Sequence, residues 1–210
     1  MCVNILPSIV LLCSLIGQPS PEIIATRAYS MGYHKTAYKR AVILSYAVHE
    51  ASILFDVPTA TITAVIERET AYQPDAISTA RCRGPMQLMP KTFKILRRAL
   101  GMPKANIDDT STNVLFGTYY LSILYKKYGK WGPAFTAYNR GPGRYDHDRH
   151  HRINDYAKKV LDRVKRIEKA QEFYSQVGPK CSLNHFQEIL DTEPVMSYST
   201  NTCSTNFLAQ

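Results

Sequence analysis

Two glutamates in the segment IERETAYQPDAIS are placed where a carboxyl group could do chemistry. Apolar side chains recur at Ile62, Val65 and Ile66 with the spacing of one helix face. The next position in that series is Glu69, because seven residues at about 100° each return to within about 20° of the starting direction. The pattern therefore predicts Glu69 on the buried face of a helix and Glu67 on the face exposed to solvent.

A carboxyl group on an apolar face loses hydration, which disfavours its ionised form and raises its pKa. Such a group still holds a proton near neutral pH and can act as a general acid. The same spacing also fits a structural glutamate that pairs with a Lys or Arg, or one that reaches solvent from a helix end. The position of Glu69 in the helical pattern leaves both interpretations open.

The elements that would position this carboxyl group are helical along most of the chain. Apolar periodicity predicts helices at 36–55, 59–70, 93–100 and 113–128, a short helix from about 133, and a last helix from about 153. Gly117 lies inside one of these patterns, which suggests a close contact with a neighbouring helix. The sequence shows no internal repeat and no convincing run of strands, so it predicts a mainly α fold.

Three motifs follow one another along the chain: ERETAYQPDAIS, GPMQLMP and AYNRGPG. In this order and spacing they resemble the lytic transglycosylase domain of the soluble-transglycosylase (SLT) type, a relative of goose-type lysozyme. The resemblance covers roughly residues 45–165 and implies a single lysozyme-like helical domain with a substrate groove. One departure is Thr70, which stands where the family usually has a serine after the catalytic glutamate.

The resemblance assigns roles to individual positions. Glu69 matches the single catalytic acid and base of the family. The positions that match its sugar-binding residues are Ser78, Gly84, Gln87, Met89, Tyr138 and Asn139. Each also has an interpretation without function: Tyr138 is one of fourteen tyrosines that could simply pack, and Asn139 could be a turn residue. Met86 could contact sugars or belong to the core.

The activity that the resemblance implies is cleavage of the β-1,4 bond between N-acetylmuramic acid and N-acetylglucosamine in peptidoglycan. Glu69 would act first as acid and then as base, leaving a 1,6-anhydromuramyl end, and no cofactor or metal is needed. A hydrolase of the same fold and a non-catalytic wall-docking component of a secretion, conjugation or phage entry apparatus are the alternatives. A basic nucleic-acid binder is disfavoured, because the chain carries no recognisable recognition motif.

Charge and chain organisation agree with an envelope protein that acts on an anionic polymer. The formal net charge is +9, which favours anionic partners such as the peptide carboxylates of peptidoglycan. Residues 1–32 are predicted to be an export segment and leader, because MCVNILPSIVLLCSLIG contains an apolar run about as long as a signal-peptide core and too short to span a membrane. Residues 33–168 are predicted to be the catalytic domain and residues 169–210 a poorly ordered polar tail. The predicted location is the periplasm, and an envelope-spanning secretion or conjugation apparatus is a candidate partner.

Cysteine and histidine usage gives little sign of a metal site. The five cysteines form no pair with zinc-ligand spacing, and Cys181 and Cys203 could form a disulfide after export. The three histidines of the segment HDRHH are predicted to be exposed in a polar loop.

Overall fold

A computed structural model describes residues 35–73, 75–148 and 150–177 of the chain. Among the described residues, those up to Gln171 belong to one compact unit, and those from Glu172 onward, at the end of the last helix, belong to a second. The predicted export segment, Cys181, Cys203 and the tail beyond Val177 lie outside the described residues. No helix in the described part of the chain has the length and apolar character needed to cross a membrane.

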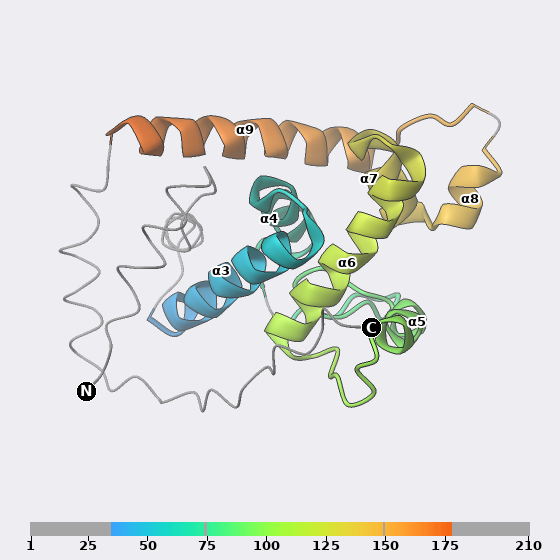
Figure 1. Cartoon of the computed structure of the whole chain (residues 1–210), viewed down its shortest axis with the longest axis horizontal. Coiled ribbons are helices and arrows are strands. Elements are labelled where there is room, and N and C mark those ends of the chain that lie inside the picture. Colours follow the sequence, from blue (N-terminus) through green and yellow to red (C-terminus); the bar gives the residue numbers. More distant parts are fainter. Residues whose placement is uncertain (1–34, 74, 149, 178–210) are drawn as a thin grey trace, which may run out of the picture. The chain divides into compact units, whose positions relative to one another are not determined.

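The described residues form a helical fold, as the sequence predicts. Labelled as in Figure 1, the helices are α3 (Lys35–Phe55), α4 (Thr59–Thr70), α5 (Pro90–Ala99), α6 (Thr110–Tyr128), α7 (Trp131–Arg140), α8 (Pro142–Asp146) and α9 (Asp155–Val177). Within the described ranges, β pairing is limited to isolated bridges that join Arg83 to Ile77 and to Leu88.

The core forms where α3 and α4 meet α6, α7 and α9. In Figure 1, α3 lies against α6, and α4 lies beside the end of α3. Fully buried side chains come from every one of these helices, among them Val48, Ile66, Leu121, Phe135 and Val160. Burying a side chain of this size contributes about 1.5–3 kcal/mol relative to leaving it in water. This packing holds α4 rigidly, which matters because α4 carries Glu69.

The helix ends follow local chemistry that the sequence already indicates. Asp109 precedes α6, and its side chain accepts a hydrogen bond from the Thr112 backbone N–H at 2.7 Å. Gly129 ends α6 with φ +70°, a left-handed conformation that glycine adopts at little cost. Helix α7 begins at Trp131 rather than near Pro133, and the Gly-Pro-Gly segment leads into the short helix α8.

Glu67 differs from the sequence-based expectation. The prediction that it is exposed to solvent is wrong, because its side chain is only 11% exposed. One carboxylate oxygen lies 3.3 Å from Nε of Arg163 in α9, and the other accepts a hydrogen bond from the Tyr72 hydroxyl at 3.2 Å. The periodicity of α4 alone cannot show that a helix almost a hundred residues later covers this face.

Candidate active site

Glu69 lies one residue before the end of α4, and its carboxyl group is shielded from water. Burial raises the pKa of Glu69 above its ordinary value of 4.5. Two neighbours oppose this rise: Tyr156 of α9 donates a hydrogen bond to Oε1 at 2.5 Å, and Arg68 contributes a nearby positive charge. Burial is the largest influence, so the carboxyl group keeps its proton to a higher pH than a glutamate in water.

Two tyrosines place neutral hydroxyl groups beside this carboxyl group. The pKa values of Tyr138 and Tyr156 are both raised well above 10.0, first by burial and then by the negative charge of Glu69. Tyr156 donates to Glu69 itself, whereas Tyr138 donates to the backbone carbonyl of Met86 at 2.7 Å. Both phenols therefore stay protonated and can act only as neutral hydrogen-bond partners at ordinary pH.

Tyr156 is a site residue that sequence reasoning missed. Its position in the apolar register of the last helix marks it as one more packed side chain. The available signal was its hydroxyl group, which needs a partner when buried. Glu69 is the acceptor that stands out on an apolar face, but the two residues are 87 positions apart. Neither helical pattern by itself could show that they meet.

Replacing Tyr156 by phenylalanine is expected to raise the pKa of Glu69 further. The hydroxyl hydrogen bond stabilises the ionised carboxylate and so lowers the pKa, and its loss leaves burial less opposed. The measurement is an NMR titration of the Glu69 side-chain carbonyl carbon in the wild type and in Tyr156→Phe. Tyr145→Phe is the matched control, because that hydroxyl bonds the His151 carbonyl instead. A Glu69 pKa unchanged or lowered in Tyr156→Phe would contradict this assignment.

Asn113 in α6 anchors the GPMQLMP segment, and sequence reasoning did not single it out. Its side chain is fully buried. Its amide nitrogen donates to the carbonyls of Arg83 (2.9 Å) and Ile107 (3.0 Å), and its amide oxygen accepts from the Met86 N–H (2.9 Å). Since the Met86 carbonyl in turn accepts from Tyr138, this asparagine indirectly positions a tyrosine beside Glu69.

Two glycines make room for this arrangement. A Cβ atom on Gly84 would lie 2.4 Å from the Asn113 amide nitrogen, and φ at Gly84 is +74°. A Cβ atom on Gly117 would lie 2.4 Å from the sulfur of Met86, so the close neighbour of this glycine is a loop side chain rather than another helix. Met86 has no exposed surface. It therefore belongs to the core and not to a sugar-contacting surface.

The predicted groove residues Ser78 and Gln87 help to build the loop between α4 and α5. The Gln87 amide nitrogen donates to the carbonyls of Ala76 and Gly84, both at 2.9 Å, which leaves its amide oxygen for a ligand. The Ser78 hydroxyl oxygen accepts from the Cys82 N–H at 3.0 Å and can still donate its own proton. Both side chains are half-buried.

Met89 and Asn139 lie at the ends of helices. Met89 precedes α5, and 49% of its surface is exposed. Asn139 is exposed near the end of α7, and its amide oxygen accepts from the Asn154 side chain at 2.9 Å. Asn154 also accepts from the Ala157 N–H at the start of α9. Asn139 is thus tied to the beginning of the helix that carries Tyr156.

The structure brings these predicted residues together to different degrees. Tyr138 is close enough to Glu69 for the carboxylate charge to raise the pKa of its phenol, and Gln87 donates a hydrogen bond to the Gly84 carbonyl. Thr70 lies with its hydroxyl 3.2 Å from the carbonyls of both Ile66 and Pro85, so the end of α4 approaches the same loop.

Candidate metal ligands are not assembled in the described part of the chain. No group of three or more His, Cys, Asp or Glu side chains that could hold a metal ion is found among those residues. The side chains of His147, His150 and His151 are exposed, and Cys82 is a half-buried free thiol.

Comparison with known proteins places this helical fold in a family. The transglycosylase SLT domain matches residues 47–160. The membrane-bound lytic murein transglycosylase C of Mannheimia succiniciproducens is 30% identical over 137 residues, covering 57% of this chain and 38% of that protein. The soluble lytic murein transglycosylase of Escherichia coli K12 is 32% identical over 95 residues, covering 42% of this chain and 15% of that protein. The matches thus span well under half the length of these relatives.

A solved structure shares the fold. The lytic transglycosylase Slt of Pseudomonas aeruginosa, solved as an inactive glutamate-to-glutamine mutant, aligns with a TM-score of 0.53 and 24% sequence identity. The alignment covers 67% of this chain and 28% of that one. Since the family match extends over more than half of the sequence and includes Glu69 and every motif around it, the chain belongs to the transglycosylase SLT domain family.

Proposed function

We propose that this protein is a peptidoglycan lytic transglycosylase in which Glu69 is the single catalytic acid and base. The observation that carries the proposal is the shielded Glu69 carboxyl group, whose pKa burial raises and which accepts a hydrogen bond from Tyr156. The bond cleaved is the β-1,4 link between N-acetylmuramic acid and N-acetylglucosamine, and the product is a 1,6-anhydromuramyl end.

One carboxyl group suffices for this reaction if it changes role between two steps. Protonated Glu69 first gives its proton to the glycosidic oxygen, which leaves as the 4-hydroxyl of N-acetylglucosamine while the muramyl N-acetyl group stabilises the cationic carbon C1. Glu69, now ionised, then takes the proton of the C6 hydroxyl as that oxygen attacks C1. The proton count balances, no water is consumed, and Glu69 ends protonated as it began.

The surroundings of Glu69 favour such a single-residue route. Ordinary glycosidases use two carboxyl groups across the scissile bond. Here the pKa of Glu69 responds to burial, to the Tyr156 hydroxyl and to the charge of Arg68. Glu67, two residues away, is engaged with Arg163 and Tyr72 instead. Tyr138 and Tyr156 can hydrogen-bond the reacting sugar or the carboxylate without exchanging protons.

The relatives support the same reaction and substrate. Both relatives compared above are named lytic murein transglycosylases. The solved neighbour is described as inactive after a glutamate is changed to glutamine, which agrees with one essential glutamate. Glycan strands of peptidoglycan are the proposed substrate. Ser78, Gly84, Gln87, Met89, Tyr138 and Asn139 are the proposed sugar-binding residues.

The proposed place of action is the periplasm, reached through the export segment at residues 1–32. The names of the relatives, one membrane-bound and one soluble, both refer to murein and so support the cell envelope as the location. An envelope-spanning secretion or conjugation apparatus is the proposed partner, because such a machine requires local opening of the wall.

The decisive experiment is digestion of purified peptidoglycan in water enriched in oxygen-18, followed by mass spectrometry of the released muropeptides. The proposal expects 1,6-anhydromuramyl products without oxygen-18, since the C6 hydroxyl and not water attacks C1. Glu69→Gln, digested in parallel, should release none of them. Reducing ends that carry one oxygen-18 atom would show a hydrolase. Binding to peptidoglycan without release of any product would show a docking component and overturn the enzymatic proposal.

A further inference from the structure

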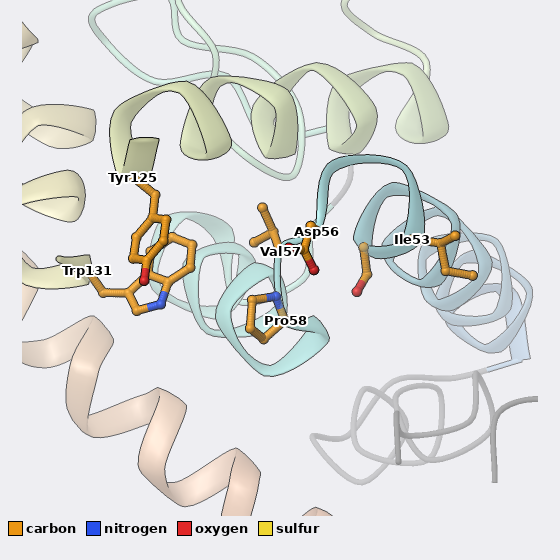
Figure 2. Close-up of a pocket in the computed structure, with 7 residues that line it drawn as sticks. Ile53, Asp56, Val57, Pro58, Tyr125 and Trp131 are labelled. Carbon is orange, nitrogen blue, oxygen red and sulfur yellow. The ribbon is translucent and has the colours of Figure 1, made fainter. Parts of the chain in front are cut away.

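A second candidate binding site lies at the N-terminal end of α4, whereas Glu69 lies near its C-terminal end. A pocket of about 410 Å³ opens there, lined by Ser52, Ile53, Asp56, Val57, Pro58, Tyr125 and Trp131. Figure 2 shows Tyr125 and Trp131 on one side, Ile53 on the opposite side, and Asp56, Val57 and Pro58 between them. Its volume falls within the range of about 300–1,000 Å³ that is usual for ligand sites.

The pocket and Glu69 are at opposite ends of the same two helices. Pro58 precedes α4 and Trp131 begins α7, whereas Glu69 and Tyr138 lie near the ends of these helices. The eleven residues from Pro58 to Glu69 correspond to about 16 Å along a helix. A ligand in the pocket therefore occupies a different place from a sugar that receives the Glu69 proton.

The aromatic side of the pocket is rigid. The Trp131 ring stacks on Tyr125 with a centroid distance of 4.2 Å and an interplanar angle of 25°, and on Phe135 at 5.4 Å and 20°. Rings held in this way lose little conformational freedom when a ligand binds. The indole N–H of Trp131 forms no hydrogen bond with any described residue.

Asp56 supplies a negatively charged hydrogen-bond acceptor to the pocket. Its carboxylate makes no hydrogen bond or ion pair with the described residues, and its side chain is exposed where it lines the pocket. Asp56 follows α3 with φ +54°, a left-handed conformation that glycine, asparagine and aspartate adopt most readily.

These groups complement an acetamido group on a sugar ring. An amide N–H of the ligand can donate to the Asp56 carboxylate, and its carbonyl can accept from the indole N–H of Trp131. The methyl group then has apolar surface on Pro58, which is exposed in the pocket. A plain hydroxylated sugar lacks both the amide donor and the methyl group.

We propose that this pocket binds an N-acetylated sugar of the glycan strand at a site separate from the Glu69 carboxyl group, through Asp56, Trp131 and the apolar surface of Pro58. The identity of the glycan rests on the proposed function. Both sugars that flank the proposed scissile bond carry an acetamido group, so a strand offers this ligand at every residue. A strand held at the pocket would keep the enzyme on the wall between cleavages.

Trp131 makes this proposal directly testable, because it is the chain's only tryptophan. Its indole N–H gives a single NMR signal that reports on the pocket. The probe is the β-1,4-linked trimer of N-acetylglucosamine, which lacks the muramic acid that the proposed reaction consumes. We expect a saturable shift of the indole signal with this trimer and none with the corresponding glucose trimer. An equal response to both sugars, or none to either, would overturn the acetamido assignment.

Asp56→Gly is the test variant, because glycine adopts the positive φ of this position and the fold should be retained. We expect affinity for the trimer, read from the indole signal, to fall about tenfold, the effect of losing a hydrogen bond to a charged group. Glu50→Gln, at an exposed position in α3, changes the net charge equally and should bind as the wild type does. Equal affinity in Asp56→Gly and the wild type would exclude Asp56 from the site.

The NMR test of the pocket and the digestion test of the proposed function can fail independently of each other. Anhydromuramyl products with a silent Trp131 signal would overturn the pocket proposal alone. A specific Trp131 response in a protein that releases no product would keep the pocket and overturn the enzyme. A shift caused by an alkyl amine but not by the trimer would show a cation site formed by Asp56 and the aromatic rings, against the sugar assignment.

Discussion

Glu69→Gln is expected to lower the rate of muropeptide release by about 10²- to 10⁴-fold, at or near the upper end of that range. General acid–base catalysis by one positioned group is usually worth this much, and in the proposed mechanism one carboxyl group serves both proton transfers. Glutamine keeps the shape of the side chain and can still accept from Tyr156, so the loss would report on the proton rather than on packing. The measurement is the initial rate of soluble muropeptide formation from purified peptidoglycan.

The same substitution is expected to stabilise the protein at neutral pH. Because burial raises the folded-state pKa of Glu69 above 4.5, ionisation of this group opposes folding. Its contribution to stability is fully present below pH 4.5 and is lost as the pH rises through the folded-state pKa. Glu69→Gln removes that loss, so its melting temperature should exceed that of the wild type by a few degrees at neutral pH and equal it below pH 4.5.

Glu67→Gln is the matched control, two residues away on the same helix. Its carboxylate faces Arg163, so its removal should lower stability and leave the catalytic rate near that of the wild type. Opposite stability changes in the two variants would establish that burial acts on one glutamate and ion pairing on the other. A wild-type rate in Glu69→Gln would remove this residue from the reaction, whatever its effect on stability.

Asn113→Ala is expected to destabilise the protein by about 3–5 kcal/mol. The substitution removes the hydrogen bonds that Asn113 makes with the Met86 N–H and the Ile107 carbonyl, and one of the two that the Arg83 carbonyl accepts, the other coming from the Leu88 N–H. It also leaves a cavity beside Gly84, which packs closely against the Asn113 side chain. Since domains of this size are stable by about 5–15 kcal/mol, the loss is a large fraction of the total. Urea denaturation followed by circular dichroism measures it.

Asn106→Ala controls for the general cost of losing an asparagine. Asn106 is exposed, and its side chain accepts one hydrogen bond, from the Asp108 N–H at 3.1 Å. We expect a cost of about 1 kcal/mol or less, because water replaces the lost partner. If Asn113→Ala cost no more than this control, the loop that carries Gln87 would not depend on Asn113.

Local patterns in the sequence were enough to locate the helices and to reveal the unusual position of Glu69. Helix formation depends on local spacing, capping residues and breakers, so α3, α4, α5 and α6 could be located within one to three residues. Three motifs in order were enough to identify the family, because their residue types are tied to a reaction and not only to a fold. The same motifs pointed to the loop that Gly84 and Gln87 build.

The tertiary structure alone decided which side chains meet Glu69 and what covers its neighbours. Tyr156 reaches Glu69 across 87 positions, and Asn113 reaches Met86 across 27. The apparent solvent face of α4 is covered where Arg163 approaches Glu67. Helical periodicity shows which face of a helix avoids water, but not which distant helix packs there. The pKa of Glu69 depends on that packing, because burial, the Tyr156 hydroxyl and the Arg68 charge together set it.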